Sequence, residues 1–302
     1  MNNLSNLDFG AIIAVLTFAL GFIINGYMNK RHKRRELNLY KNLIISWTES
    51  HKKAIDNFTN SLQKFGSEVK NNIYMNIPQY DNYLMSLERL NSIPIEKIAD
   101  VFMINIKIKD EEDSTEIAAK HMHRYIASIE YLSAVSIKVM KYRDDYEIEA
   151  KNIMNEWNTN FLNLKYSLIS RTTHVKWNET SPEEQCLYKK IEDMFLMMQL
   201  LPKNEDCEAG MPIWDEKFIH PAMTYIEQSI GNNPQLLSSE IFITISTYIA
   251  GLQFLFMKWQ ANKGFGCVFL DTHKHVVSCC KDIYEAIEYF KNHRLRHSLY
   301  IK

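Results

Sequence analysis

An uncharged apolar run near the N-terminus, Phe9–Met28, constrains this chain more than any other feature. The run reads FGAIIAVLTFALGFIINGYM, and its few polar residues are Thr17, Asn25 and the glycines. About 20 residues of α-helix, at 1.5 Å per residue, span roughly 30 Å, the thickness of a bilayer's hydrocarbon core. The run therefore predicts a single N-terminal transmembrane helix.

The charges beside this run predict its orientation. No Lys or Arg precedes it, and a basic cluster follows it directly. Positive residues next to a span stay on the cytoplasmic side, so we expect a single-pass protein of the cell (inner) membrane, with the N-terminus outside and the C-terminal domain cytoplasmic. The alternatives are a cleaved signal peptide, which carries its charge before a shorter apolar region, and a buried helix of a soluble protein.

The basic cluster is expected to contact the membrane surface. Each Lys or Arg near anionic lipid contributes about 1 kcal/mol. Basic runs also bind nucleic acid in other settings, but a net charge of −1 gives this chain no general attraction to it. The lipid bilayer is therefore the expected partner, and nucleic acid is disfavoured. The cluster consists of Lys30, Arg31, Lys33, Arg34 and Arg35.

Small residues within the apolar run follow a helical spacing that places them on one face. Small side chains allow a second backbone to approach closely, and Thr and Asn form hydrogen bonds across such contacts. This face predicts self-association in the bilayer, although the same spacing also arises by chance because small residues are common in membrane helices. Its members are Gly10, Ala14, Thr17, Gly21 and Asn25.

The rest of the chain is expected to be all-α, with the membrane helix continuing into a long helix and a cytosolic multi-helix bundle. Only 9 Gly and 7 Pro occur in 302 residues. A helical apolar stripe predicts one helix from about residue 9 to residue 65, with a slip in phase near His51 and Gly66 as its C-terminal cap. The stripe either packs on later helices of the chain or pairs with another subunit.

Several later elements follow from local signals. Ser181-Pro182-Glu183-Glu184 predicts a capped helix start. The polar residues Arg143–Asp145 predict a break between two long antiparallel helices, with one continuous helix as the alternative. Residues 80–90 predict a short helix, and residues 104–108 a frayed helix end or an edge strand. Ile241–Met257 predicts a core helix, with a second membrane span as the alternative.

These signals suggest three parts. Residues 1–28 form the transmembrane anchor, residues 29–201 a cytosolic helical bundle with long antiparallel helices, and residues 202–302 a C-terminal helical subdomain packed on the bundle. The boundary is placed in the loop that runs from Pro202 to Pro212. Five cysteines without regular spacing suit a reducing compartment.

No motif for catalysis, nucleotide binding or a cofactor occurs in the sequence. Four potential zinc ligands lie within eight residues, but their spacing matches no standard site and favours ordinary helix residues. His121 and His123 are too close in sequence to share one helix face. The four potential ligands are His273, His275, Cys279 and Cys280.

The sequence therefore favours a membrane-anchored, non-enzymatic helical protein that self-associates or scaffolds an unknown protein partner at the inner membrane face. The alternative is a membrane-perturbing, pore-forming effector of a bacterial toxin or antiviral defence system. A third possibility is a helical nuclease without a recognisable motif. Each of the three predicts a different experimental signature.

Overall fold

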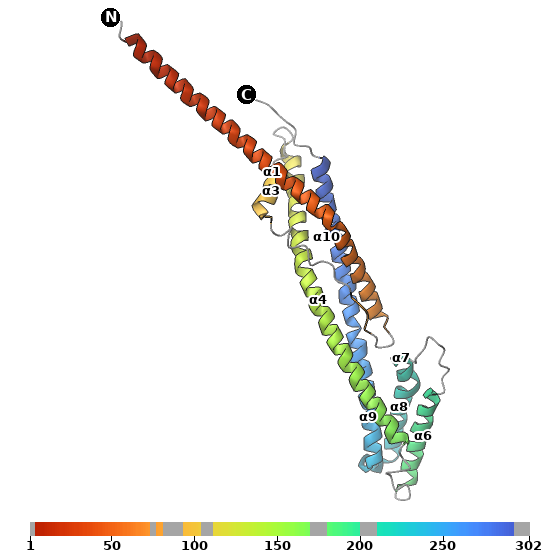
Figure 1. Ribbon diagram of the computed structural model, residues 1–302. Coiled ribbons are helices and arrows are strands. Elements are labelled where there is room, and N and C mark those ends of the chain that lie inside the picture. Colours follow the sequence, from red (N-terminus) through yellow and green to blue (C-terminus); the bar gives the residue numbers. More distant parts are fainter. Residues whose placement is uncertain are drawn as a thin grey trace. The chain divides into compact units, whose positions relative to one another are not determined.

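The computed structural model describes residues 4–72, 77–80, 93–103, 111–169, 180–199 and 210–292, with side chains omitted at 4–13, 103, 111–115, 169, 199 and 292. Of the described residues, 94% are helical and none is in a strand, so the predicted all-α class is confirmed (Figure 1). The helices are α1 (Leu4–Lys70), α3 (Ile95–Met103), α4 (Glu111–Ile169), α6 (Pro182–Gln199), α7 (Met211–Trp214), α8 (His220–Asn232), α9 (Glu240–Asn262) and α10 (Gly264–Asn292).

Helix α1 is continuous from the apolar run into the body of the protein, as expected, and extends beyond both predicted ends. The predicted slip in phase near His51 is wrong. The line of buried residues passes through Thr48 and His51 without a change of phase. Because these two core positions hold polar residues, the apolar pattern in the sequence has a gap there although the buried line does not. His51 is accommodated because its Nδ1 lies 2.6 Å from the Trp47 carbonyl oxygen. The buried line is Leu37, Ile44, Thr48, His51, Ile55, Phe58, Leu62, Phe65 and Val69.

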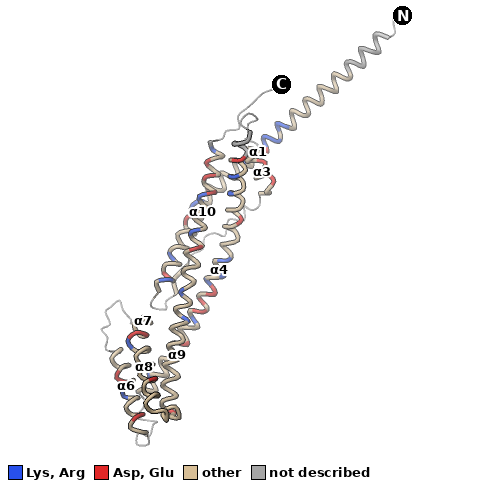
Figure 2. Tube along the Cα trace, turned by 180° about the vertical axis from the view of Figure 1, so that it is seen from behind, with Lys and Arg blue, Asp and Glu red and all other residues tan. Residues whose placement is uncertain are grey.

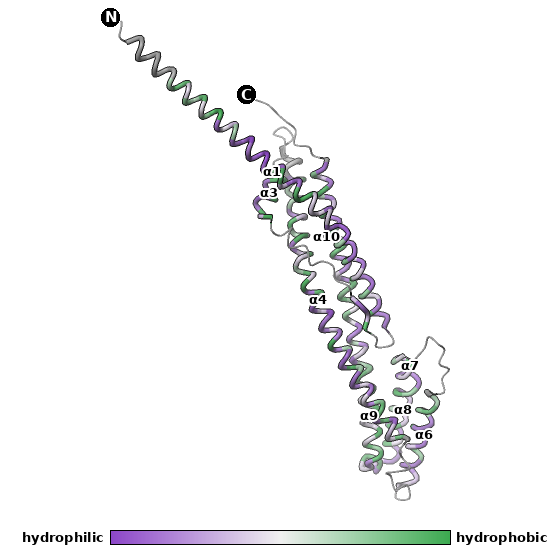
Figure 3. Tube along the Cα trace, in the orientation of Figure 1, coloured by the Kyte–Doolittle hydropathy of each residue, from purple (hydrophilic) through white to green (hydrophobic). Residues whose placement is uncertain are grey.

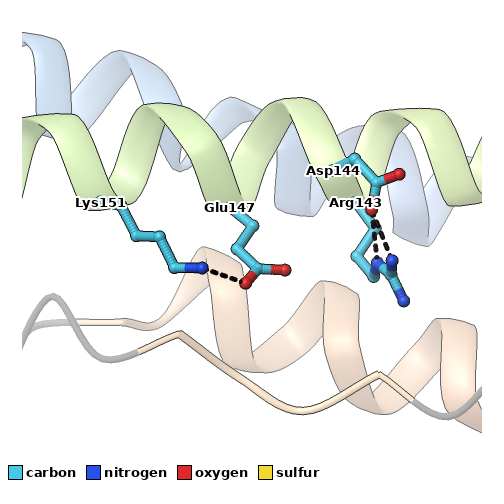
Figure 4. Close-up of polar contacts among 4 residues, drawn as sticks. All are labelled: Arg143, Asp144, Glu147 and Lys151. Carbon is cyan, nitrogen blue, oxygen red and sulfur yellow. Dashed lines mark hydrogen bonds and ion pairs between the residues drawn. The ribbon is translucent and has the colours of Figure 1, made fainter.

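The predicted break at Arg143–Asp145 is also wrong, because α4 is one helix of 59 residues. The polar run occupies a surface turn: Arg143 donates to the Asp144 carboxylate at 3.0 Å, and Lys151 to Glu147 at 2.6 Å (Figure 4). Tyr146 follows directly and is fully buried, so the core-facing line continues without a break. The expected antiparallel pair within 111–169 is therefore replaced by a single long helix.

The chain forms two compact units, and α1, α4 and α10 contribute to both. In the first unit (Met1–Phe58, Tyr83–Ser136 and His275–Lys302), α10 runs antiparallel to α4. His121 stacks on Tyr289 at 4.8 Å between ring centroids, and Tyr131 meets His275 at 6.3 Å. Residue numbers thus increase along α4 while those of the contacting residues decrease along α10, as expected for antiparallel helices. Helix α3 closes this unit with Phe102, whose ring lies 4.2 Å from that of Phe290.

One polar pair lies in the core of the first unit. The Thr48 hydroxyl and the Tyr125 hydroxyl are 3.4 Å apart, and both side chains are about 1% exposed. Burial raises the pKa of Tyr125 to about 12, and its hydrogen bond to Thr48 partly opposes this shift. The phenol is therefore neutral at physiological pH and fills a core position, with its hydroxyl paired.

In the second unit (Thr59–Asn82 and Ile137–Lys274), α1 and α10 approach closely through two glycines. A Cβ added to Gly266 would lie 2.6 Å from the Lys70 nitrogen and 2.7 Å from the Gly66 oxygen. Only glycine fits this backbone contact. Gly66 was predicted to cap α1, and this is wrong: the helix continues to Lys70, and the glycine makes room for α10.

The shorter helices of the second unit pack on the end of α4. The predicted capping box is confirmed, since the Ser181 backbone nitrogen donates to Glu184 at 2.6 Å and Glu184 donates back to the Ser181 hydroxyl at 3.2 Å. A π-helical turn, Asp215–Ile219, joins α7 to α8. It presents Phe218 to an aromatic cluster at the centre of the unit, which also contains Phe161, Phe195 and Trp214.

Candidate functional site

The first half of α1 exposes a continuous series of large apolar side chains. Nine of them, between Val15 and Met28, are 42% to 77% exposed. Figure 3 shows this segment as a hydrophobic stretch followed by a strongly hydrophilic one. Full burial of such a side chain contributes about 1.5–3 kcal/mol, so covering all nine is worth more than about 10 kcal/mol. The segment thus has a strong physical drive towards an apolar environment.

One face of this segment forms a shallow groove. It is lined by the predicted small or polar residues Ala14, Thr17, Gly21 and Asn25, with Phe18 and Phe22 beside them. A Cβ added to Gly21 would meet no atom within 4 Å, and the same holds for Gly26. Gly10, the fifth predicted member, lies on the same helix, but its surroundings fall outside the described side chains. The structure therefore brings four of the five predicted residues onto one open face.

The basic cluster lies on the next turns of α1 and is exposed (Figure 2). Lys33 reaches the Asp100 carboxylate of α3 at 3.9 Å. One turn further along, Lys97 of α3 donates to Glu36 at 2.7 Å and lies 5.7 Å from the Tyr40 ring centroid. Helix α3 thus begins its contact with α1 at the cluster, which marks where the apolar segment ends and the packed body begins.

The His and Cys residues of α10 show no shared site. His275 contacts the Tyr131 ring, and Cys280 lies buried on the apolar face. Burial raises the pKa of the Cys279 thiol, which disfavours the thiolate form that binds metals. Across the described residues, no three His, Cys, Asp or Glu side chains gather closely enough to hold a metal ion.

The described residues contain one stretch long and apolar enough, by length and composition, to cross a membrane. It is Glu240–Lys291, and 28% of its apolar window is buried. Among the described residues, the N-terminal run does not meet the same criterion of length and composition. Its side chains are described only from Ala14 onward. Membrane insertion of Phe9–Met28 therefore stays a prediction. Helix α9, predicted as a core helix, buries one face in the second unit.

Sequence reasoning missed the opposite face of α9. Five residues there follow the spacing 4-3-4-3 and are exposed: Ile243, Thr247, Ala250, Phe254 and Met257. Their spacing is visible in the sequence, but the core-facing line of the same helix is more apolar and was the only one interpreted.

Comparison of the chain with protein-family models, with curated proteins and with solved structures finds no match. The functional argument therefore depends on the chain's own residues.

Proposed function

We propose that this protein is a membrane-anchored, non-enzymatic helical protein that self-associates in the bilayer and presents its helical body at the inner membrane face. The observation that carries this proposal is the row of exposed apolar side chains from Val15 to Met28. Such a row is unfavourable in water and favourable in lipid. The basic cluster that follows supports the proposed orientation, with the N-terminus outside.

Self-association is proposed through the face formed by Gly10, Ala14, Thr17, Gly21 and Asn25. Lipid tails are as apolar as the helix, so association in a bilayer depends on close packing and on hydrogen bonds between helices. The open groove along this face offers both, because it combines small residues with Thr17 and Asn25. A second copy of the same helix fits such a groove.

A matched pair of glycines tests this face. Neither Gly21 nor Gly26 has a described atom within 4 Å of an added Cβ, so a larger side chain at either site starts from open space. At 100° per residue, Gly26 lies well away from the proposed face. Gly21→Leu is expected to weaken self-association about tenfold, a loss of roughly 1–2 kcal/mol. Gly26→Leu should leave it unchanged.

The measurement is the mass of the full chain in mild detergent over a range of protein-to-detergent ratios. Equal weakening by the two substitutions would indicate a general disturbance of the helix. No weakening by Gly21→Leu would contradict the proposed face.

A second candidate function is a membrane-perturbing effector, and the polar side chains of the groove favour it. Thr17 and Asn25 lie on the face that would turn inward in an assembly of several helices. Such an assembly would place polar groups along a path for ions. Expression of the wild-type chain would then depolarise cells, and Asn25→Leu would reduce the effect. Unaltered membrane potential at high expression would exclude this role.

A further inference from the structure

The exposed face of α9 is a narrow apolar stripe opposite the buried face of the same helix. With 100° per residue, its five residues fall within an arc of about 80°, centred opposite the core line. Ile243, Phe254 and Met257 are 49%, 56% and 63% exposed, although each is a large apolar side chain. The helix thus has two apolar lines, and among the described residues only one of them is buried. The stripe consists of Ile243, Thr247, Ala250, Phe254 and Met257.

The spacing of the stripe indicates that its partner is another helix. Apolar residues that alternate at intervals of three and four form the seam of a left-handed helix pair. Polar side chains border the stripe, with Ser246 and Gln253 on one side and Thr244 and Lys258 on the other. A helix that lies in lipid has a wider apolar arc than this. The narrow seam therefore favours a protein partner over a membrane.

The charges at the two ends of the stripe complement each other in an antiparallel pair of identical helices. Glu240 lies before the first stripe residue, and Lys258 lies after the last. The Lys258 ammonium already lies along the stripe, 5.0 Å from the Phe254 ring centroid. Antiparallel pairing brings Glu240 of one copy to the lysine end of the other, whereas parallel pairing places like charges together.

The sizes of the side chains point to the same arrangement. If a two-fold axis passes beside Ala250, Ile243 of one copy meets Met257 of the other, and the small Thr247 meets the large Phe254. Ala250 meets itself, where a small residue allows the helices to cross closely. Parallel pairing would instead place Phe254 against Phe254 and leave a gap at Ala250.

We propose that this stripe of α9 binds a second copy of the chain in antiparallel orientation, with the two-fold axis beside Ala250. The seam is roughly 21 Å long. One helix face per partner is small compared with the roughly 800 Å² per partner of a stable interface. The contact is therefore a weak one. It is separate from the proposed contact of α1, and neither depends on the other.

Disulfide crosslinking of full-chain variants with one added cysteine each, in lysates of the expressing cells, tests the geometry. The background carries Cys186→Ser, Cys207→Ser and Cys267→Ser, which removes the exposed thiols Cys186 and Cys267 together with Cys207. Ala250→Cys is expected to form a disulfide-linked dimer. Gln260→Cys, an exposed control on the same helix, is expected to yield at least about fivefold less, because its two copies lie roughly 30 Å apart and a disulfide requires Cα atoms within about 7 Å.

A mixed pair distinguishes the two orientations. Ile243→Cys and Met257→Cys should each fail to crosslink alone and should crosslink to each other when the two chains are expressed together. If either crosslinks alone as well as Ala250→Cys does, the pairing is parallel and the proposal is overturned.

Alkylation of Ala250→Cys by a water-soluble maleimide separates the remaining outcomes. A thiol that neither crosslinks nor reacts until detergent is added would lie in lipid, and one that reacts freely without crosslinking would lie in solvent. Either result overturns the proposal. The readout is a bond across α9, so its failure leaves the α1 proposal untouched, and the converse also holds.

Discussion

The two parts of helix α1 differ in the exposure of their apolar side chains. Between Ala14 and Met28, α1 carries large apolar side chains around most of its circumference, and these side chains are exposed. After Glu36, most of its apolar residues lie on one line along the helix, and that line is buried, while Leu39 and Leu43 lie off the line and are exposed. The difference shows how pattern specifies the environment, because a helix apolar all round suits lipid and a helix with one stripe suits other helices.

The glycines of α1 differ in the same way. Gly21 has no neighbour within 4 Å of an added Cβ, whereas the Cβ of an alanine at Gly66 would lie 3.0 Å from Leu270 and Phe269. In the second case, a contact within the chain leaves little room for a Cβ. In the first, the space is open to a partner outside it. Each of the following experiments changes one residue type at two contrasting places in the chain.

The largest effect is expected from charges in the apolar segment. Leu16→Arg combined with Leu20→Arg should release the chain from membranes, because each arginine opposes insertion by about 2.5–3.5 kcal/mol. The matched control is Leu39→Arg with Leu43→Arg, two exposed leucines beyond the basic cluster. Fractionation after an alkaline wash is the measurement. Retention of the first variant in the membrane would show that another segment, such as Glu240–Lys291, holds the chain there.

Removal of aromatic side chains should separate the two environments by stability. Phe65 is 1% exposed and contacts the rings of Tyr80, Tyr146 and Phe269. Phe65→Ala is expected to destabilise the second unit by about 3–5 kcal/mol. Phe22→Ala, whose ring is 76% exposed, should leave the unfolding midpoint unchanged in detergent. Circular dichroism monitors the unfolding of both variants. An equal loss of stability in the two would contradict the distinction between the two environments.

A smaller effect is expected at the glycine contact. Gly266→Ala places a methyl group against the backbone of Lys70 and Gly66, and overpacking of this kind costs about 1–3 kcal/mol. Gly264→Ala, two residues earlier, meets nothing within 4 Å and should be neutral or slightly stabilising. Thermal unfolding of the two variants compares them directly. A neutral Gly266→Ala would show that the helices separate there without loss.

The smallest effect is expected from the buried polar pair. Thr48→Val keeps the shape of the side chain but leaves the Tyr125 hydroxyl unpaired, which should cost about 1 kcal/mol. The control is Thr272→Val, since the Thr272 hydroxyl donates to Val268 on an exposed face. Denaturant unfolding resolves a difference of this size. If Thr48→Val increased the free energy of unfolding, the hydroxyl pair would destabilise the core.

Much of the fold could be predicted from local and periodic signals. The capping box at Ser181 was confirmed, and the buried residues Val276, Ile283 and Phe290 of α10 follow a helical period that is visible in the sequence. Each depends on residues within a few turns of one another. The short helix expected at 80–90 and the segment 104–108 lie outside the described residues, apart from Tyr80.

The wrong predictions share a physical cause. His51, Arg143 and Gly66 were each interpreted from residue type alone, as a slip, a break and a cap. Their roles depend on which positions of each helix are buried: the approach of α10 makes Gly66 a contact residue, His51 lies on the buried line of α1, and the buried Tyr146 continues the core-facing line of α4 past Arg143. The exposed stripe of α9 was missed for the same reason, since burial shows which of its two apolar lines the chain covers.

Membrane topology tests the central claim most directly. Ser5→Cys and Lys53→Cys, each placed in the background that lacks Cys186, Cys207 and Cys267, lie on either side of the apolar segment of α1. In intact cells, a maleimide that does not cross membranes is expected to label Ser5→Cys and to label Lys53→Cys only after permeabilisation. Labelling of Lys53→Cys alone, or of both variants, in intact cells would contradict a single N-terminal span with the body of the protein inside.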